Sequence, residues 1–94
     1  MKIVWSPRAI RHLTELRDYV DKDNPSAAHR LATRIVGSFE LLEGQPLMGR
    51  TGRVAGTREL VIPDSPYIVP YRIRGERLDL LAVFHGRQKW PKRL

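Results

Sequence analysis

The sequence has no cysteine and no long apolar run. Without thiols the chain can form neither a disulfide nor a thiolate metal site, which is usual for a protein of a reducing compartment. No stretch of about 18 apolar residues occurs, so we expect no membrane-spanning helix. The apolar opening, residues 1–5, is too short for a secretory signal peptide. We therefore expect a cytoplasmic protein, and we expect no metal and no cofactor.

Acidic residues are scarce in the second half of the chain. The 94 residues carry a net charge of +7. Residues 1–45 hold seven Lys/Arg and six Asp/Glu, whereas residues 46–94 hold ten and four. A basic field of this kind attracts nucleic acid or an acidic protein segment. The alternative is a solvated surface that only keeps the protein soluble.

Two helices are predicted in the first half, after a short strand at residues 2–5. Ser6 and Asn24 are good N-caps, and each is followed by a proline that fits the first helical position. Gly44 marks the end of the second helix. The connection between the helices is short, so an antiparallel hairpin is expected. Apolar residues at helical spacing define its buried faces, at Ile10, Leu13, Leu16 and Val20, and at Ala28, Leu31, Ala32, Ile35, Phe39 and Leu42.

The second half reads as a loop followed by strands. Residues 46–57 contain three glycines, at positions 49, 52 and 56, and are expected to turn without regular structure. Pro70 lies inside one strand and implies a bulge or an outward-facing edge, because it cannot donate a ladder hydrogen bond. A glycine turn at residues 74–76 favours a hairpin. The predicted strands are residues 58–62, 67–73 and 77–85.

These elements predict one α+β domain over residues 1–94. Each helix has one apolar stripe, and packing the hairpin on one face of an antiparallel sheet buries both. The fold expected is an N-terminal strand, an antiparallel helical hairpin and a C-terminal three-stranded antiparallel sheet. The exposed side of the hairpin and the sheet edge remain free to receive a helix and a strand of a partner.

Six segments in this order resemble the RelE/ParE superfamily of bacterial type II toxins, and more closely its ParE branch. They are "WSPRAIRHLTEL", "NPSAAHRLATRI", "PLMGR", "TRELVI", "PYIVPYRI" and "LLAVFHGRQKWP". The resemblance covers nearly the whole chain and depends on order and spacing rather than on one motif. It implies the RelE/ParE-like fold and a cognate antitoxin, ParD-like, that neutralises the toxin by direct binding. It also implies contact with DNA only through the antitoxin, and no contact with a membrane.

The resemblance leaves two targets open. ParE-like members inhibit DNA gyrase and need no catalytic site, whereas RelE-like members cut mRNA on the ribosome. One family ribonuclease has a catalytic arginine at the position of Tyr67 and a tyrosine at that of Gly86, and this chain has neither side chain. The absence favours a gyrase inhibitor of the kind associated with plasmid stabilisation. A relative that only binds the antitoxin, without toxicity, is the third alternative.

His85 is the candidate catalytic residue of the ribonuclease alternative. A histidine at a strand end can move a proton, and nearby arginines can stabilise phosphate charge. Its partners there are Arg50, Arg53 and Arg58. The alternative is that His85 hydrogen-bonds to backbone and only shapes the last turn. The candidates for contacting a target or the antitoxin are Arg50, Arg53, Arg58, Arg72, Arg87, Lys89 and Trp90.

Trp90 and the other histidines have simpler expected roles. Trp90 lies among cations in "KWPKR" and either stacks on a base or packs the C-terminal segment against the sheet. His12 and His29 lie in different helices without further metal-ligand spacing, so both are expected at the surface.

Overall fold

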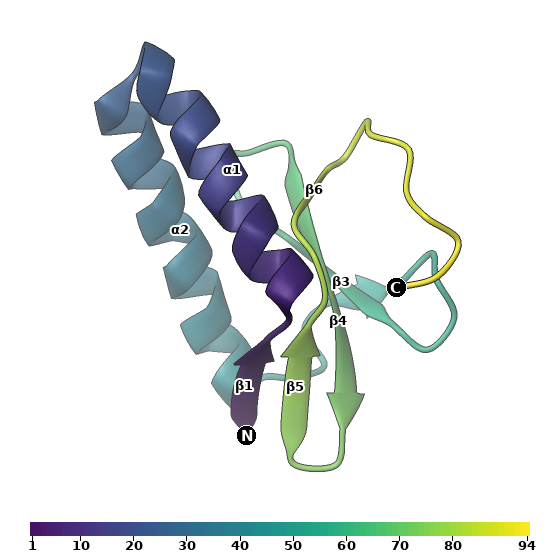
Figure 1. The fold of residues 1–94 in the computed structure, drawn as a ribbon. Helices are drawn as coiled ribbons and strands as arrows, with labels where there is room; N and C mark the ends of the chain where they lie inside the picture. Colours follow the sequence, from purple (N-terminus) through teal and green to yellow (C-terminus); the bar gives the residue numbers. More distant parts are fainter.

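The computed structural model describes residues 1–94 (Figure 1). A helical hairpin lies against one face of a twisted sheet. The C-terminal segment, residues 86–94, lies on the opposite side of the sheet. Neither α-helix combines the length and the apolar composition that a membrane span requires. The elements are β1 (Lys2–Trp5), α1 (Pro7–Asp23), α2 (Pro25–Gly44), β2 (Arg50–Thr51), β3 (Arg58–Val61), β4 (Tyr67–Arg74), β5 (Arg77–Leu80) and β6 (Phe84–His85).

Both predicted helix starts are confirmed. The Ser6 hydroxyl accepts a hydrogen bond from the Ala9 N–H at 3.0 Å and donates one to the Leu81 carbonyl at 2.9 Å. The Asn24 side chain accepts from the Ala27 N–H at 3.1 Å, and the Asn24 N–H donates to the Val20 carbonyl at 2.9 Å. One residue therefore ends α1 and begins α2, which makes the hairpin turn tight.

The core lies between the hairpin and the sheet. The predicted face of α2 is confirmed, because Ile35, Phe39 and Leu42 are buried in the main cluster. The predicted face of α1 was wrong at Ile10, which is 53% exposed, while the smaller Ala9 is fully buried. Ala9, Leu13, Leu16 and Val20 share one side of the helix, and Ile10 lies about 100° around the helix axis from Ala9, so it points toward solvent.

The sheet has the order β1-β5-β4-β3-β2, with β6 also paired to β4. The α+β prediction is confirmed, and the three predicted C-terminal strands form the antiparallel centre of the sheet. The sequence did not indicate where β1 would pair. It lies parallel to β5, with Lys2 opposite Arg77 and Trp5 opposite Leu80, so the sheet is mixed.

A bulge or an outward-facing edge was predicted at Pro70, and the structure has a bulge in the strand opposite it. Tyr71 pairs with Leu80 and Ile68 pairs with Phe84, so three residues, 81–83, lie opposite two residues, 69–70. The Pro70 carbonyl accepts from the Leu81 N–H at 2.9 Å, so the backbone nitrogen of Pro70 also faces the bulge. Because the pairing is irregular there, the missing N–H of proline leaves no regular ladder hydrogen bond unmade. The predicted strand 77–85 is therefore divided into β5 and β6.

The loop at residues 46–57 is shorter than predicted, because it contains β2. Of its three glycines, only Gly56 has a positive φ, 77°, as a turn requires. Gly49 and Gly52 serve close approach instead. A Cβ at Gly49 would lie 2.5 Å from the Tyr71 hydroxyl, and one at Gly52 would meet Thr57.

Candidate partner-binding surface

The face of the sheet opposite the helices carries the candidate residues Arg50 and Arg72. Side chains alternate between the faces along each strand. Arg50 pairs with Glu59 and Glu59 pairs with Pro70, so these three share one face. Arg72 lies two residues beyond Pro70 on the same face. We call this the open face, because the helices cover the other one (Figure 1).

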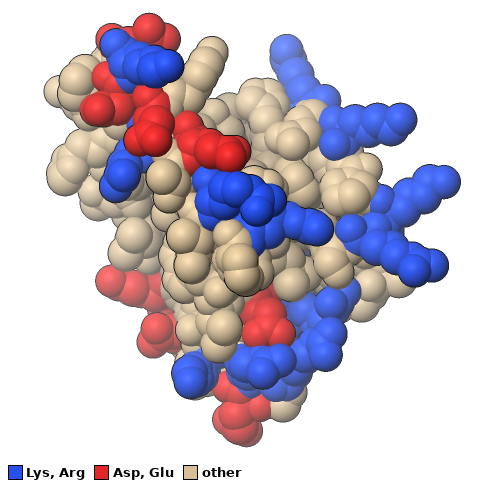
Figure 2. Space-filling view, viewed as in Figure 1, with Lys and Arg blue, Asp and Glu red and all other residues tan.

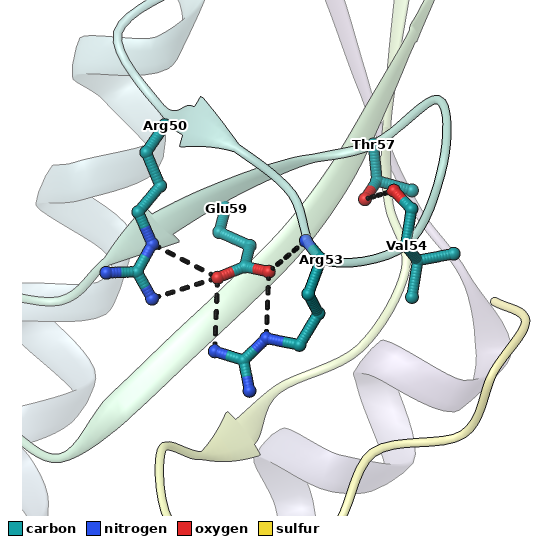
Figure 3. A network of polar contacts seen from close by, with 5 residues as sticks. All are labelled: Arg50, Arg53, Val54, Thr57 and Glu59. Carbon is teal, nitrogen blue, oxygen red and sulfur yellow. Dashed lines mark hydrogen bonds and ion pairs between the residues drawn. The ribbon is translucent and has the colours of Figure 1, made fainter.

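Glu59 is the centre of a charged network on the open face (Figure 3). Its Oε1 accepts from Arg50 Nε at 3.1 Å and Nη2 at 2.9 Å, and from Arg53 Nη2 at 3.2 Å. Its Oε2 accepts from the Arg53 backbone N–H at 2.8 Å and from Arg53 Nε at 3.0 Å. The side chain of Glu59 is only 2% exposed. Five charge-assisted hydrogen bonds therefore compensate one buried carboxylate.

The network sets both the ionisation of Glu59 and the charge of the surface. Burial acts to raise the pKa of Glu59, but the hydrogen bonds from Arg53 and Arg50 outweigh it and hold the pKa below its ordinary value. Glu59 therefore stays ionised and neutralises part of the charge of Arg50 and Arg53. Each of these two arginines retains 40% or more of its side-chain exposure, so their outer edges still face solvent.

The same network holds the C-terminal segment. The Arg53 guanidinium carbon lies 3.6 Å from the centre of the Trp90 ring, a cation–π contact. Trp90 packs in turn on Phe84, with ring centroids 4.8 Å apart. Its Nε1 is buried and has no hydrogen-bond partner in the chain. The structure therefore places Trp90 against the sheet and the network, in the arrangement expected for tail packing.

His85 makes contacts that limit its chemistry. Its Nδ1 accepts a hydrogen bond from the Arg87 N–H at 3.1 Å, and its ring meets Tyr67 edge-on at 5.7 Å. A neutral histidine that accepts at Nδ1 carries its proton on Nε2. His85 thus presents a donor, not a free base, through its remaining nitrogen.

The structure does not bring all the predicted catalytic residues together. Phe84 and His85 are successive strand residues, so they point to opposite faces, and Trp90 with Arg53 lies on the Phe84 side. His85 pairs with Tyr67 and therefore lies on the helix-side face. Arg58 lies on that face too, but its guanidinium donates to the Gly49 carbonyl at 2.8 Å and the Leu47 carbonyl at 3.2 Å. Arg50 and Arg53 are on the other face.

The remaining candidate cations are free of ion pairs. Arg72 has no carboxylate partner, and Arg87 and Lys89 lie in the exposed part of the C-terminal segment. Figure 2 shows Lys and Arg side chains projecting from the right-hand side of the view, where this segment lies, while acidic side chains gather over the tip of the helical hairpin.

Two residues of this region were not foreseen as functional. Glu59 is an acidic residue within an apolar strand of a basic half, and that isolation was the available signal. His12 was expected at the surface but is half-buried, and its Nδ1 accepts from the Val83 N–H of the bulge at 3.2 Å. Burial lowers the pKa of His12, and the charge of Arg11 adds to the effect. His12 therefore fastens α1 to the bulge next to Phe84.

Comparison with known proteins assigns this arrangement to a family. The model of the family described as ParE toxin of type II toxin-antitoxin system, parDE, matches residues 3–90. The chain belongs to the ParE toxin family. It is 45% identical over 91 residues to Y4kP, a candidate toxin of Sinorhizobium fredii, covering 97% of this chain and 94% of that protein. It is 33% identical over 85 residues to toxin RelE2 of Caulobacter vibrioides, covering 90% and 94%.

A solved structure has the same fold. A chain of the chromosomal ParDE TA system from P. aeruginosa superposes with a TM-score of 0.81 at 24% identity, covering 90% of this chain and 95% of that chain. The protein is thus a type II toxin of the ParE/RelE superfamily, and its family partner is an antitoxin.

Proposed function

We propose that this ParE-family chain inhibits DNA gyrase by direct contact, through its basic C-terminal segment. The observation that carries the proposal is the Glu59–Arg53–Trp90 chain of contacts, which holds a positively charged segment in a defined position on the sheet. A preorganised segment loses less conformational entropy on binding than a mobile tail. Arg87 and Lys89 then supply unpaired positive charge to the contact.

The placement of His85 supports contact rather than cleavage. The ribonuclease alternative needs a proton acceptor close to several cations. Here Nδ1 is already occupied by the Arg87 N–H, and Arg53 lies on the opposite face of the sheet. Glu59 also neutralises part of the charge of Arg50 and Arg53, which would otherwise be offered to phosphate.

The first functional test uses purified toxin, gyrase, ATP and supercoiled plasmid. We expect protein-linked linear DNA to accumulate, and antitoxin to abolish it. The double variant Arg87→Gln, Lys89→Gln removes two exposed charges from the proposed contact. It should need roughly tenfold more toxin for the same linear DNA, since a few contacts dominate a typical interface. The measurement is the linear fraction on a protease-treated gel.

A matched charge control separates contact from general electrostatics. The variant Arg11→Gln, Lys22→Gln removes the same charge from exposed positions on α1 and should leave the linear fraction unchanged. Equal loss in both double variants would contradict a specific role for the C-terminal segment. Absence of linear DNA together with cleavage of mRNA on ribosomes that is lost in His85→Ala would establish the endonuclease alternative instead. Absence of both effects would indicate a relative that only binds antitoxin.

For the antitoxin, we propose the outer side of the helical hairpin as the docking surface. Hollows of about 400 and 340 Å³ adjoin each other along α2 and share His29 and Ala32. Val36 borders the larger hollow and is 49% exposed. Gly37 also lines it, in the middle of a helix, where glycine costs up to about 1 kcal/mol relative to alanine. The chain has room for a Cβ at Gly37, so its own packing does not require glycine there.

Gly37→Ala should therefore have opposite effects on stability and on binding. We expect the free energy of unfolding of the isolated toxin to rise by roughly 0.5–1 kcal/mol, because alanine favours the helix. We expect affinity for the antitoxin to fall about tenfold, because the added methyl group would occupy space that a closely packed partner helix needs. Urea unfolding and calorimetric titration measure the two effects. Gly44→Ala, at the end of α2 and equally free of contacts, is the control and should leave affinity unchanged. Unchanged affinity in Gly37→Ala would place the antitoxin elsewhere.

A further inference from the structure

One hollow of the molecule is lined by no residue of the helical hairpin or of the C-terminal segment. It measures about 300 Å³ and lies at the corner formed by β2, β3 and β4. Thr51 pairs with Arg58, and Arg58 pairs with Tyr71, so these three side chains form one row on the helix-side face. The lining residues are Thr51, Gly56, Thr57, Arg58, Tyr71 and Ile73. Arg58 is the one charged residue among them.

Arg58 is held in a fixed orientation but has no anionic partner. Its Nη1 donates to the carbonyls of Gly49 and Leu47, so the guanidinium is anchored from one side. Its Nε and Nη2 make no hydrogen bond within the chain, and no carboxylate lies within ion-pair distance. Four other strand or hairpin arginines are paired, Arg50 and Arg53 with Glu59, and Arg74 and Arg77 with Asp79.

The surroundings favour a small planar anion. Arg58 is half-buried beside the fully buried Tyr71, so its charge is less hydrated than that of an exposed arginine. Two free N–H groups on one edge of a guanidinium match the two oxygens of a carboxylate. A phosphate, with up to two charges, would meet only one cation in this hollow.

We propose that this hollow is a carboxylate subsite, in which Arg58 receives an Asp or Glu side chain of the antitoxin. The proposal rests on the antitoxin partnership of the family and not on gyrase as the target. The occupant is an acidic residue of an extended segment, because the hollow opens beside β2, the edge strand of the sheet, where an extended chain can pair. Arg58 acts by binding, and its anchored Nη1 keeps the other two donors directed for the contact.

A pair of isosteric variants at Thr51 tests the subsite without disturbing Arg58. Thr51→Glu places a carboxylate directly across from Arg58 on the neighbouring strand, where a cross-strand ion pair would occupy the guanidinium. Thr51→Gln has the same size and no charge. We expect Thr51→Glu to lower the affinity for antitoxin at least tenfold, and Thr51→Gln to change it less than threefold, in calorimetric titration of the full-length proteins. Equal affinities of the two variants would overturn the proposal.

A second measurement defines the ligand without any partner protein. Acetate and inorganic phosphate are titrated into ¹⁵N-labelled toxin, and the Nε–Hε signal of Arg58 is followed with that of exposed Arg11 as reference. We expect acetate to shift the Arg58 signal saturably in wild type and in Thr51→Gln, and not in Thr51→Glu. Tighter binding of phosphate than of acetate would overturn the carboxylate assignment. A shift no larger than that of Arg11 would overturn the subsite itself. Neither result depends on the gyrase assay, so the two proposals fail separately.

Discussion

Replacing Glu59 with glutamine is expected to lower the free energy of unfolding by about 2–3 kcal/mol. The carboxylate is buried and accepts five hydrogen bonds from Arg50 and Arg53. Glutamine has one acceptor oxygen, so its amide group would face guanidinium donors. Breaking a buried pair from one side costs up to about 3–5 kcal/mol. The half-exposed arginines regain water, which places the expected loss below that range.

The loss should depend on pH in a defined direction. The pKa of Glu59 in the folded state lies below its ordinary value of 4.5. The unfolded chain therefore takes up the proton first as the pH falls, and the folded state loses stability relative to it. The contribution of Glu59 is complete above about pH 4.5 and disappears as the pH falls through the lowered folded value. Urea unfolding of wild type and Glu59→Gln should thus give curves that converge in acid.

A control at another glutamate isolates the network. Glu76→Gln changes the same group in the exposed turn between β4 and β5, where Glu76 makes no ion pair, and should alter stability by less than about 0.5 kcal/mol. Equal effects of the two variants, or a constant difference between wild type and Glu59→Gln down to pH 2, would contradict the central role of Glu59.

Gly49→Ala is expected to be destabilising by about 2–3 kcal/mol, although its backbone conformation suits any residue. A Cβ there would lie 2.5 Å from the Tyr71 hydroxyl and 2.9 Å from the Glu59 carbonyl oxygen. Tyr71 is fully buried and cannot yield, because its hydroxyl accepts from the Gly49 N–H at 2.9 Å and donates to the Pro46 carbonyl at 2.7 Å. Overpacking of this kind typically costs about 1–3 kcal/mol, and here two hydrogen bonds are also displaced.

Gly44→Ala is the matched control for this prediction. It makes the same chemical change five residues earlier, where a Cβ meets nothing within 4 Å. We expect it to be neutral or slightly stabilising in the same urea unfolding experiment. If Gly49→Ala proved as mild as Gly44→Ala, the contact of Tyr71 with the loop would have to be looser than the structure indicates.

Local chemistry made much of the fold predictable. Ser6 and Asn24, each followed by proline, indicated both helix starts, because caps act within one turn. Gly44 indicated the end of α2, and Pro70 limited the strand that contains it. Ile10 was misplaced because steps of three and four to Leu13 fit Ala9 as well as Ile10, and the stripe that is buried starts at Ala9. The pairing of β1 with β5 joins residues far apart in sequence, and no local pattern encodes it.

The candidate site was predicted less completely for the same reason. The cationic residues were visible in the sequence, but their partners were not. Glu59 determines which charge Arg50 and Arg53 present, and the bulge after Leu80 determines that Phe84 faces Trp90 while His85 faces Tyr67. Such relations depend on sheet register, and a shift of one residue would exchange the two faces.

The parallel pairing of β1 with β5 also has a consequence for the order in which the protein assembles during translation. β1 leaves the ribosome before either helix, yet its partner strand is Arg77–Leu80. The Ser6 hydroxyl likewise has no acceptor until Leu81, whose carbonyl it binds, has been synthesised. Contacts between such distant residues form late, because a long loop must close before they contribute. A nascent chain that ends before residue 77 therefore lacks the partner strand of β1 and cannot complete the sheet. The complete sheet, and the toxin surface built on it, therefore forms only after residues 77–80 have been synthesised.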